Sequence, residues 1–344
     1  MVKNIKRGSL TKENQNCAPV LEVIDLSTSF LTAAGEIKAV RDVSFSLYEG
    51  EVLTVVGESG CGKSVTARSL LRLIDSPGYI KSGQVLLNGV NLLNLSENEM
   101  RRLRGTEISM VFQDPMTSFD PVYTVGQQFT EALLAHEKIS RREAKKKALH
   151  MLSVVSLHDP KRVFNAYTFH LSGGMRQRVM IAIALAMKPK VIIADEPTTA
   201  LDVTVQSGIL AELRRLNKET GCAVVLITHD LGVVAELADR VAVMYAGRIV
   251  ETGSVYDIFD HAQHPYTRAL MTSINPVQED GWLTAVPGQP PDMANLPAGC
   301  SFAPRCPEAS GRCMHSEPEQ YPVASEHRVS CWHAESEERK IAGA

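Results

Sequence analysis

The eight residues Gly57–Ser64 constrain the fold of this chain more than any other stretch. They read GESGCGKS and match the phosphate-binding pattern G-x-x-x-x-G-K-[ST] at every position. A short apolar run over 52–56 precedes them, and apolar residues recur at helical spacing after Ser64. A buried strand, a glycine-rich loop and a helix in this order are the context that the motif requires. We therefore predict an α/β fold in which this loop binds a polyphosphate.

The residue types explain how such a loop holds phosphate. Glycines let successive backbone N–H groups point at phosphate oxygens, and the start of the next helix adds free N–H groups and the positive end of its dipole. Lys63 is placed to neutralise the β- and γ-phosphates, and the Ser64 hydroxyl to ligate Mg²⁺. The residues predicted to contact the nucleotide here are Gly57, Glu58, Ser59, Gly60, Cys61, Gly62, Lys63, Ser64 and Val65.

Size and charge narrow the class of protein. At 344 residues the chain exceeds the size of one hydrophobic core, so two domains are expected. The net charge of −3 gives no general reason to expect nucleic acid as a partner. The longest apolar run, Val179–Met187, is about half of the roughly 20 residues that a membrane span needs. The polar residues 1–19 lack the apolar region of a secretory signal, so we expect a flexible leader and a cytoplasmic location.

Local signals mark elements between the motifs. The pair Asn88-Gly89 predicts a hairpin turn. Ser96 with Glu99, and Ser140 with Glu143, have the spacing of capping boxes at helix starts. From residue 125 to about 157 the sequence reads as helical. These signals predict a helical region that interrupts the strands.

Carboxylates and a histidine follow two further apolar runs. The run over 191–195 ends in Asp195 and is followed by Glu196, and doubly wound sheets place their chemistry at such strand ends. Asp195 is a Mg²⁺-side partner for the glycine loop, and Glu196 is placed to accept a proton from water. The run over 223–227 is followed closely by His229. A lone histidine there is more often structural, but a place level with Asp195 in a parallel sheet favours a phosphate contact.

Taken together, the motifs resemble those of ABC-transporter ATPase subunits. They occur in the order and spacing of that family within residues 20–255: Gly57–Ser64, Gln113, Leu171–Met175, Asp195-Glu196, Ala200-Leu201-Asp202 and His229. The resemblance implies an ABC-type P-loop NTPase. Its RecA-like parallel-sheet core would be joined by an N-terminal antiparallel β region and by a helical subdomain over about 95–175.

The family also implies roles for matching positions. Phe30, which by itself reads as core packing, would stack on adenine, and Gln113 would contact Mg²⁺ or the attacking water. Ser64 and Asp195 would complete the Mg²⁺ site, and Glu196 would be the catalytic base, with Lys63 and His229 on the phosphates. The other matching positions would act toward a paired subunit. The signature loop, Leu171, Ser172, Gly173 and Gly174, would bind the ATP held by that subunit, and Asp202 would communicate between the two ATP sites.

A narrower resemblance reaches about residue 333. The segments VGESGCGKS, FQDPMTS, HPYTRAL and GCSFAPRCP are similar to those of bacterial oligopeptide/dipeptide importer ATPases. The likeness implies an ATPase on the cytoplasmic face of the membrane, paired with a second, related ATPase. Two transmembrane permease subunits and an extracytoplasmic substrate-binding protein would complete the importer. The relatives usually carry Tyr-Pro-His-Gln before the signature loop, whereas this chain has Tyr167-Thr168-Phe169-His170, which leaves the coupling between subunits open.

Other functions remain open beside this interpretation. The cargo could be di- or oligopeptides, nickel, glutathione, opines or antimicrobial peptides. ABC ATPases that act on DNA or the ribosome form another class, but they carry tandem ATPase domains or long coiled-coil insertions. This sequence contains one ATPase motif set and no heptad run. We therefore expect a transport ATPase and no nucleic-acid partner.

Composition changes after residue 255, so we expect a separate C-terminal extension over 256–344, irregular and rich in proline and cysteine. Cys300, Cys306, Cys313 and Cys331 are separated by five, six and seventeen residues. This is neither the paired spacing of most zinc sites nor a ferredoxin run. Four thiols in a segment with little core still indicate a crosslinking centre. Spacing alone favours zinc over an iron–sulfur cluster.

The importer resemblance changes that order, because some of these ATPases carry a [4Fe-4S] cluster in the extension. The cluster then comes first, zinc second and free thiols third, with a structural role favoured over redox sensing. Cys61 is a separate case with two interpretations. Its thiolate could be stabilised by a loop that attracts anions, or the residue could be a small filler.

Overall fold

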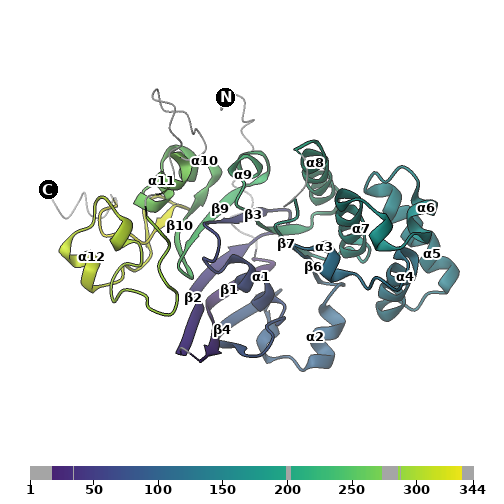
Figure 1. The fold of residues 1–344 in the computed structure, drawn as a ribbon, viewed down its shortest axis with the longest axis horizontal. Helices are drawn as coiled ribbons and strands as arrows, with labels where there is room; N and C mark the ends of the chain where they lie inside the picture. Colours follow the sequence, from purple (N-terminus) through teal and green to yellow (C-terminus); the bar gives the residue numbers. More distant parts are fainter. Residues whose placement is uncertain (1–17, 34, 199–202, 273–285, 287, 335–344) are drawn as a thin grey trace. The chain divides into compact units, whose positions relative to one another are not determined.

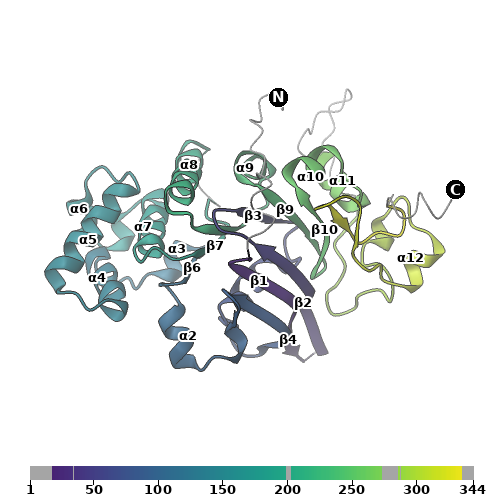
Figure 2. The same ribbon diagram turned by 180° about the vertical axis from the view of Figure 1, so that it is seen from behind.

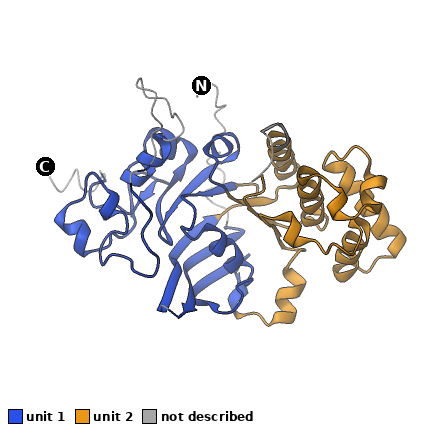
Figure 3. Ribbon diagram, viewed as in Figure 1, with its two compact units in different colours: residues 1–46, 52–93, 228–344 blue, residues 47–51, 94–227 orange. Residues whose placement is uncertain are grey.

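The computed structural model describes residues 18–33, 35–198, 203–272, 286 and 288–334 (Figure 1). Most of the predicted leader and the predicted site residue Asp202 lie outside the described residues. The chain forms two compact units (Figure 3). Unit 1 comprises residues 1–46, 52–93 and 228–344, and unit 2 comprises residues 47–51 and 94–227. The expected division into an ATPase domain over 20–255 and an extension over 256–344 stays a prediction.

Unit 1 contains a four-stranded sheet in the order β2-β1-β4-β5. Its strands are β1 (Leu21–Thr32), β2 (Gly35–Leu47), β4 (Gly78–Leu87) and β5 (Val90–Asn91). β1 pairs with β4 and β4 with β5, both antiparallel. At the turn between β4 and β5, Asn88 and Gly89 have φ angles of 48° and 80°, the left-handed conformation of a tight hairpin. The predicted hairpin is confirmed.

A second group of strands in unit 1 has the order β11-β12-β10-β9-β3. The strands are β3 (Val52–Val56), β9 (Arg240–Tyr245), β10 (Arg248–Ser254), β11 (Tyr321–Pro322) and β12 (Arg328–Val329). β3 and β9 are parallel, whereas the pairs from β9 outward to β11 are antiparallel. The C-terminal extension is therefore less irregular than expected. It adds two short strands to this sheet, because pairing with β10 buries Val329 completely.

The helical segments of unit 1 are short. They are α1 (Lys63–Leu70), α9 (Leu231–Leu237), α10 (Val255–Asp260), α11 (Pro265–Thr272), η4 (Ala303–Arg305) and α12 (Gly311–His315), with η2 (Leu92–Asn94) at its boundary. One buried core joins β3 and β9 to the extension: Val56, Val243 and Tyr245 belong to the same apolar cluster as Tyr266 and Phe302. Side chains from both sides of residue 255 thus share a core.

Unit 2 contains three parallel strands in the order β8-β7-β6. They are β6 (Ile108–Val111), β7 (Val191–Asp195) and β8 (Ala223–Ile227). Every residue of these strands is buried. Continuous apolar runs of this kind are typical of parallel strands that are covered on both faces. The predicted α/β fold with parallel strands is confirmed.

Three helices of unit 2, α4, α6 and α7, contact α5 (Figure 2). The helices of this unit are α2 (Glu97–Leu103), α3 (Pro115–Ser118), α4 (Val125–His136), α5 (Arg141–Val154), α6 (Pro160–Asn165), η3 (Thr168–His170), α7 (Gly173–Leu185) and α8 (Val203–Thr220). The predicted helical stretch over 125–157 is two helices. It breaks because Ser140 caps a new start, and its capping box with Glu143 and that of Ser96 with Glu99 are both confirmed. None of the described helices is both long and apolar enough to cross a membrane.

Candidate functional site

The phosphate-binding loop of unit 1 runs between β3 and α1, and two of its glycines allow close backbone approach. A Cβ atom on Gly57 would lie 2.2 Å from the carbonyl oxygen of Met244 in β9. A Cβ atom on Gly62 would lie 2.3 Å from the carbonyl oxygen of Ala39 in β2, and Gly62 also has a φ of 105°. No other residue fits either position without a shift of backbone. The local fold therefore requires the glycines that the motif supplies.

The start of α1 is open to an anion. Its N-cap, Gly62, is left-handed and has no capping side chain, and its first turn carries no acidic residue. The first N–H groups of a helix have no partner within the helix, and the dipole places positive charge there. The buried Lys63 ammonium donates to the carbonyl oxygens of Gly57 (2.7 Å) and Glu58 (2.9 Å). Ser64 and Val65 follow in the first turn and are half-buried.

Glu58 in the loop contacts two residues that sequence analysis did not identify as site residues. Its backbone N–H donates to the hydroxyl of Tyr266 at 2.9 Å, and its carboxylate accepts two hydrogen bonds from Arg305 at 2.7 and 2.9 Å. The partners lie 208 and 247 positions further along the chain. No periodicity could reveal contacts over such separations. The only signal was that both residues lie in segments quoted for the importer resemblance, HPYTRAL and GCSFAPRCP.

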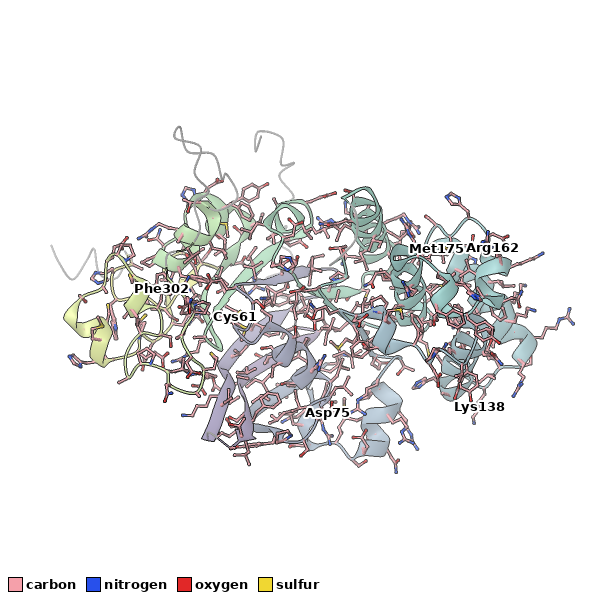
Figure 4. All side chains as sticks on the ribbon, viewed as in Figure 1. Cys61, Asp75, Lys138, Arg162, Met175 and Phe302 are labelled. Carbon is pink, nitrogen blue, oxygen red and sulfur yellow. The ribbon has the colours of Figure 1, made fainter. Side chains whose placement is uncertain are left out.

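Cys61 is the loop residue with two open interpretations. The Cys61 side chain, labelled in Figure 4, is buried, and that burial raises the pKa of its thiol. The Lys63 ammonium, 3.7 Å from the sulfur, opposes the shift without reversing it. The burial of this side chain favours the interpretation of Cys61 as a small filler beneath the loop.

Two other predicted contacts lie in unit 1. Phe30 in β1 is half-buried and faces β4, where a Cβ atom on Gly78 would come within 2.5 Å of its ring. His229 is exposed and directly precedes Asp230, the N-cap of α9. The side chain of Asp230 accepts a hydrogen bond from the N–H of Gly232 at 2.8 Å. The roles of Phe30 on adenine and His229 on the γ-phosphate stay predictions.

Unit 2 brings two predicted catalytic residues, Gln113 and Glu196, into contact. Asp195 ends β7 with 1% of its surface exposed, and Glu196 follows with a φ of 45°. The side-chain amide of Gln113, beyond the end of β6, donates to a carboxylate oxygen of Glu196 at 3.0 Å. The Glu196 N–H donates to the carbonyl of Ile227 at 2.9 Å. A glutamate held in the left-handed region is strained, and such strain concentrates at functional sites.

The signature loop precedes α7 in unit 2. Leu171 is buried, and Ser172 is the N-cap, whose hydroxyl accepts a hydrogen bond from the N–H of Met175 at 3.3 Å. Gly173 and Gly174 open the helix, whose first turn has no acidic residue. His170, which replaces the usual glutamine, packs edge to face on the exposed Phe169 at 4.4 Å between ring centroids.

The four cysteines of the extension are free thiols in this structure. The N–H of Cys300 donates to the carbonyl of Cys313 at 2.8 Å, and the Cys313 sulfur lies 3.7 Å from Nε2 of His333. Burial raises the pKa of the Cys300 thiol to about 11 and also raises those of Cys306 and Cys331. Within the described residues, no three His, Cys, Asp or Glu side chains are grouped so that they could hold a metal ion. The predicted ligand set is not assembled in this conformation.

Two family models match the chain. The ABC transporter model matches residues 40–199, which include the phosphate loop and the signature loop. The model of the oligopeptide/dipeptide transporter C-terminal region matches residues 250–313, which include three of the four clustered cysteines. Both resemblances stated from the motifs are thereby supported by whole-segment matches.

Individual proteins agree with the family models. The oligopeptide transport ATP-binding protein OppD of Bacillus subtilis is 51% identical over 91% of this chain and 88% of its own length. The dipeptide transport ATP-binding protein DppD of the same organism is 50% identical over 91% of this chain and 94% of its own. Among solved structures, the dimeric bacterial ABC transporter cassette MJ0796 is 29% identical with a TM-score of 0.62, covering 68% of this chain and 98% of that one. This chain therefore belongs to the ABC-transporter ATPases, in the family of oligopeptide and dipeptide transport ATP-binding proteins.

Proposed function

We propose that this chain hydrolyses ATP to drive the import of di- or oligopeptides through a membrane ABC transporter. The observation that carries the proposal is the 51% identity to an oligopeptide transport ATP-binding protein over 88% of its length. The identity accompanies a phosphate loop whose geometry suits an anion, with an uncapped start of α1 and a buried lysine. We infer that ATP is the nucleotide and that Gly57–Ser64 holds its phosphates.

Each unit supplies its own groups for the proposed reaction. In unit 2, Gln113 holds a carboxylate oxygen of Glu196, which orients that carboxylate as the base for the attacking water. In unit 1, Lys63 supplies positive charge for the β- and γ-phosphates, with His229 as a further phosphate contact. Bound Mg²⁺ would neutralise phosphate charge. Ser64, Gln113 and Asp195 offer the hydroxyl, amide and carboxylate oxygens that Mg²⁺ prefers.

A second ATPase subunit would complete each site. The start of α7, with the signature residues Leu171, Ser172, Gly173 and Gly174, carries two glycines and no acidic residue in its first turn. Such a start accepts the phosphates of an ATP held by the partner. Asp202 would communicate between the two sites. We propose a related chain rather than a copy as the partner, on the resemblance to the importer family.

The partners in the membrane would be two permease subunits, with an extracytoplasmic binding protein reached through them. Unit 2 exposes large apolar side chains that suit such an interface: Met116, Val122, Tyr123, Tyr167 and Phe169. It also carries a pocket of about 750 Å³ lined largely by α4, with residues of α5 and α6. These features support peripheral attachment to the permeases at the cytoplasmic face of the membrane.

The function is tested by purifying the tagged chain from its native membrane in mild detergent and identifying its companions. We expect a related ATPase and two permeases, and ATP-dependent uptake of a labelled dipeptide when the complex is reconstituted in vesicles. Competition by unlabelled oligopeptide, nickel or glutathione then identifies the cargo class. Uptake that only nickel or glutathione inhibits would contradict the peptide assignment while leaving the ATPase assignment intact.

We also propose that Cys300, Cys306, Cys313 and Cys331 hold a structural [4Fe-4S] cluster, with zinc as the alternative. The support is that the Cys300 and Cys313 segments are hydrogen-bonded and that Cys300 and Cys306 pack against the apolar cluster that contains Tyr266 and Phe302. The thiols must lose their protons and the 300–331 segment must close further, because no metal-ligand group is formed among the residues that the structure describes. Iron, zinc and sulfide analysis of protein purified without oxygen tests this. Finding neither metal would sink the proposal, and zinc alone would select the alternative.

A further inference from the structure

One residue of the phosphate loop, Glu58, is bound at three separate groups. Its backbone N–H donates to the Tyr266 hydroxyl at 2.9 Å, and its carbonyl accepts from the Lys63 ammonium at 2.9 Å. Its carboxylate accepts a two-pronged pair of hydrogen bonds from Arg305. Two of these three partners come from the C-terminal extension. All four residues belong to unit 1.

Arg305 is held by several contacts besides those with the loop. Its side chain is only 5% exposed, and it also donates to the Tyr245 hydroxyl at 3.3 Å and to the Val286 carbonyl at 3.2 Å. Its guanidinium lies over the rings of Tyr245 (5.8 Å) and Phe302 (5.9 Å). A guanidinium held this way presents its planar fork to a carboxylate at little further entropic cost.

Tyr266 is equally constrained. It is completely buried in α11, and its ring packs on Tyr245 at 4.6 Å and on Phe302 at 5.4 Å between centroids. Tyr245 and Phe302 are 5.3 Å apart, so the three rings contact one another. The aromatic cluster formed by Tyr245, Tyr266 and Phe302 thus supports both side chains that hold Glu58. This support is rigid and is built largely from residues of the extension.

Because Glu58 is charged, its ion pair with Arg305 affects ligand binding as well as the position of the loop. A carboxylate in a loop that binds a polyphosphate repels its ligand, and across a partly buried site that repulsion is only weakly screened. Arg305 cancels this charge and fixes the loop at once. We propose that Arg305 and Tyr266 are positioning residues for ATP binding, which act on the phosphate loop through Glu58. The inference deepens the proposed function, because it rests on ATP binding at Gly57–Ser64.

The test measures binding of a non-hydrolysable ATP analogue with Mg²⁺ to the full chain by calorimetry. We expect Arg305→Met to weaken binding by about tenfold, and by more at low salt than at high salt, because an unpaired carboxylate remains in the loop. The double variant Glu58→Gln with Arg305→Met removes both charges and should recover most of the loss. A purely structural ion pair would instead weaken binding to the same extent at low and at high salt. Arg305→Lys keeps the charge but not the fork, and we expect a loss of about threefold.

Two controls separate the possible failures. Arg268 pairs with Glu308 elsewhere in the extension, and both side chains are more than 40% exposed, so Arg268→Met should leave binding unchanged. Lys63→Ala should abolish binding, and if it does not, the proposed ATP site itself is wrong. If Lys63→Ala abolishes binding while Arg305→Met binds like the unaltered chain, the positioning inference alone is overturned. A double variant as weak as Arg305→Met would also overturn it. If Arg305→Met does not fold, Arg305→Lys is measured in its place, and a normal affinity of that variant at low salt would overturn the inference.

Discussion

Two helices of this protein follow glycine-rich motifs, and they begin in different ways. In unit 1, α1 has the left-handed Gly62 as its N-cap and no side chain that caps its first turn. In unit 2, α7 has the extended Ser172 as its N-cap, and the serine hydroxyl already accepts the Met175 N–H. Neither first turn carries an acidic residue. Both starts therefore suit an anion, but only α7 meets part of its own capping requirement.

The support around the two starts differs as well. The loop before α1 is bound through Glu58 by Tyr266, Lys63 and Arg305, and its glycines lie against the backbones of β2 and β9. The loop before α7 is preceded by an exposed aromatic group that includes Phe169 and His170. A rigid, uncapped start suits a ligand that the chain holds by itself. A self-capped start beside exposed side chains suits a surface that acts only when a partner brings the ligand.

The largest expected effect separates binding from reaction. Glu196→Gln keeps the hydrogen-bonding side chain but removes the base, so ATP hydrolysis should fall by about 10²–10³-fold while the ATP analogue still binds at α1. Steady-state hydrolysis and calorimetry measure the two quantities. Glu236→Gln, on the exposed face of α9, is the matched control and should hydrolyse ATP normally. Undiminished turnover of the Glu196 variant would remove it from the role of base.

The next test uses pH to weaken the packing around Tyr266, which supports the loop before α1. Burial lowers the pKa of His264 to about 4, against an ordinary value of 6.5, and its Nδ1 accepts the Tyr266 N–H at 3.0 Å. Between these values the unfolded chain binds a proton that the folded chain does not. Stability should therefore fall as pH drops from 6.5 to 4, by up to about 3 kcal/mol. Urea unfolding at several pH values measures it, and His264→Asn should flatten the slope. An unchanged slope in that variant would contradict the assignment.

A glycine substitution tests whether close backbone approach is what shapes the start of α1. Gly62→Ala would force a methyl group to within 2.3 Å of the Ala39 carbonyl oxygen at a left-handed φ, so we expect about 1–3 kcal/mol of strain and weaker ATP binding. Gly60→Ala is the matched control. It has a φ of 79° but open space around the added methyl, and it should lose less stability and less affinity. Equal effects would show that backbone conformation alone matters.

The smallest effect concerns the start of α7. Ser172→Ala removes the cap on Met175 and should destabilise the protein by about 1 kcal/mol without changing ATP binding by the chain alone. Ser140→Ala removes the corresponding cap of α5 and serves as the control for stability. In the assembled transporter, only the Ser172 variant should hydrolyse ATP more slowly. A loss of binding in the isolated chain would break the contrast between the two helix starts.

Elements whose formation depends on sequence neighbours were predictable. The strand, loop and helix around Gly57–Ser64, the hairpin at Asn88-Gly89 and the capping boxes at Ser96 and Ser140 all appear where local chemistry placed them. The stretch over 125–157 was only partly predictable. Its helical residues were recognised, but the break between α4 and α5 was not, although the cap at Ser140 marked it.

Contacts between distant segments were not predictable. The Arg305–Glu58 pair spans 247 positions, and the pairing of β12 with β10 depends on the burial of Val329. The direction of the pKa shift of Cys61 was also not predictable, because the pKa of a thiol depends on burial as much as on neighbouring charge. Which groups become neighbours is decided by packing of apolar surface, which no short pattern encodes.

The sequence by itself determined the motifs of this protein: a phosphate loop, the Asp195-Glu196 pair and a signature loop, in the order of an ABC ATPase. Each of these is a short run whose residue types suffice, since glycine, lysine and carboxylate act through their own geometry and charge. Only the tertiary structure decided that Gln113 donates a hydrogen bond to Glu196. It also decided that Tyr266 and Arg305 of the C-terminal extension bind the phosphate loop through Glu58. The Glu58 contacts arise because the aromatic rings of Tyr245, Tyr266 and Phe302, which come from distant parts of the sequence, pack together. This packing fixes the positions of the neighbouring polar groups and so decides which hydrogen bonds they make.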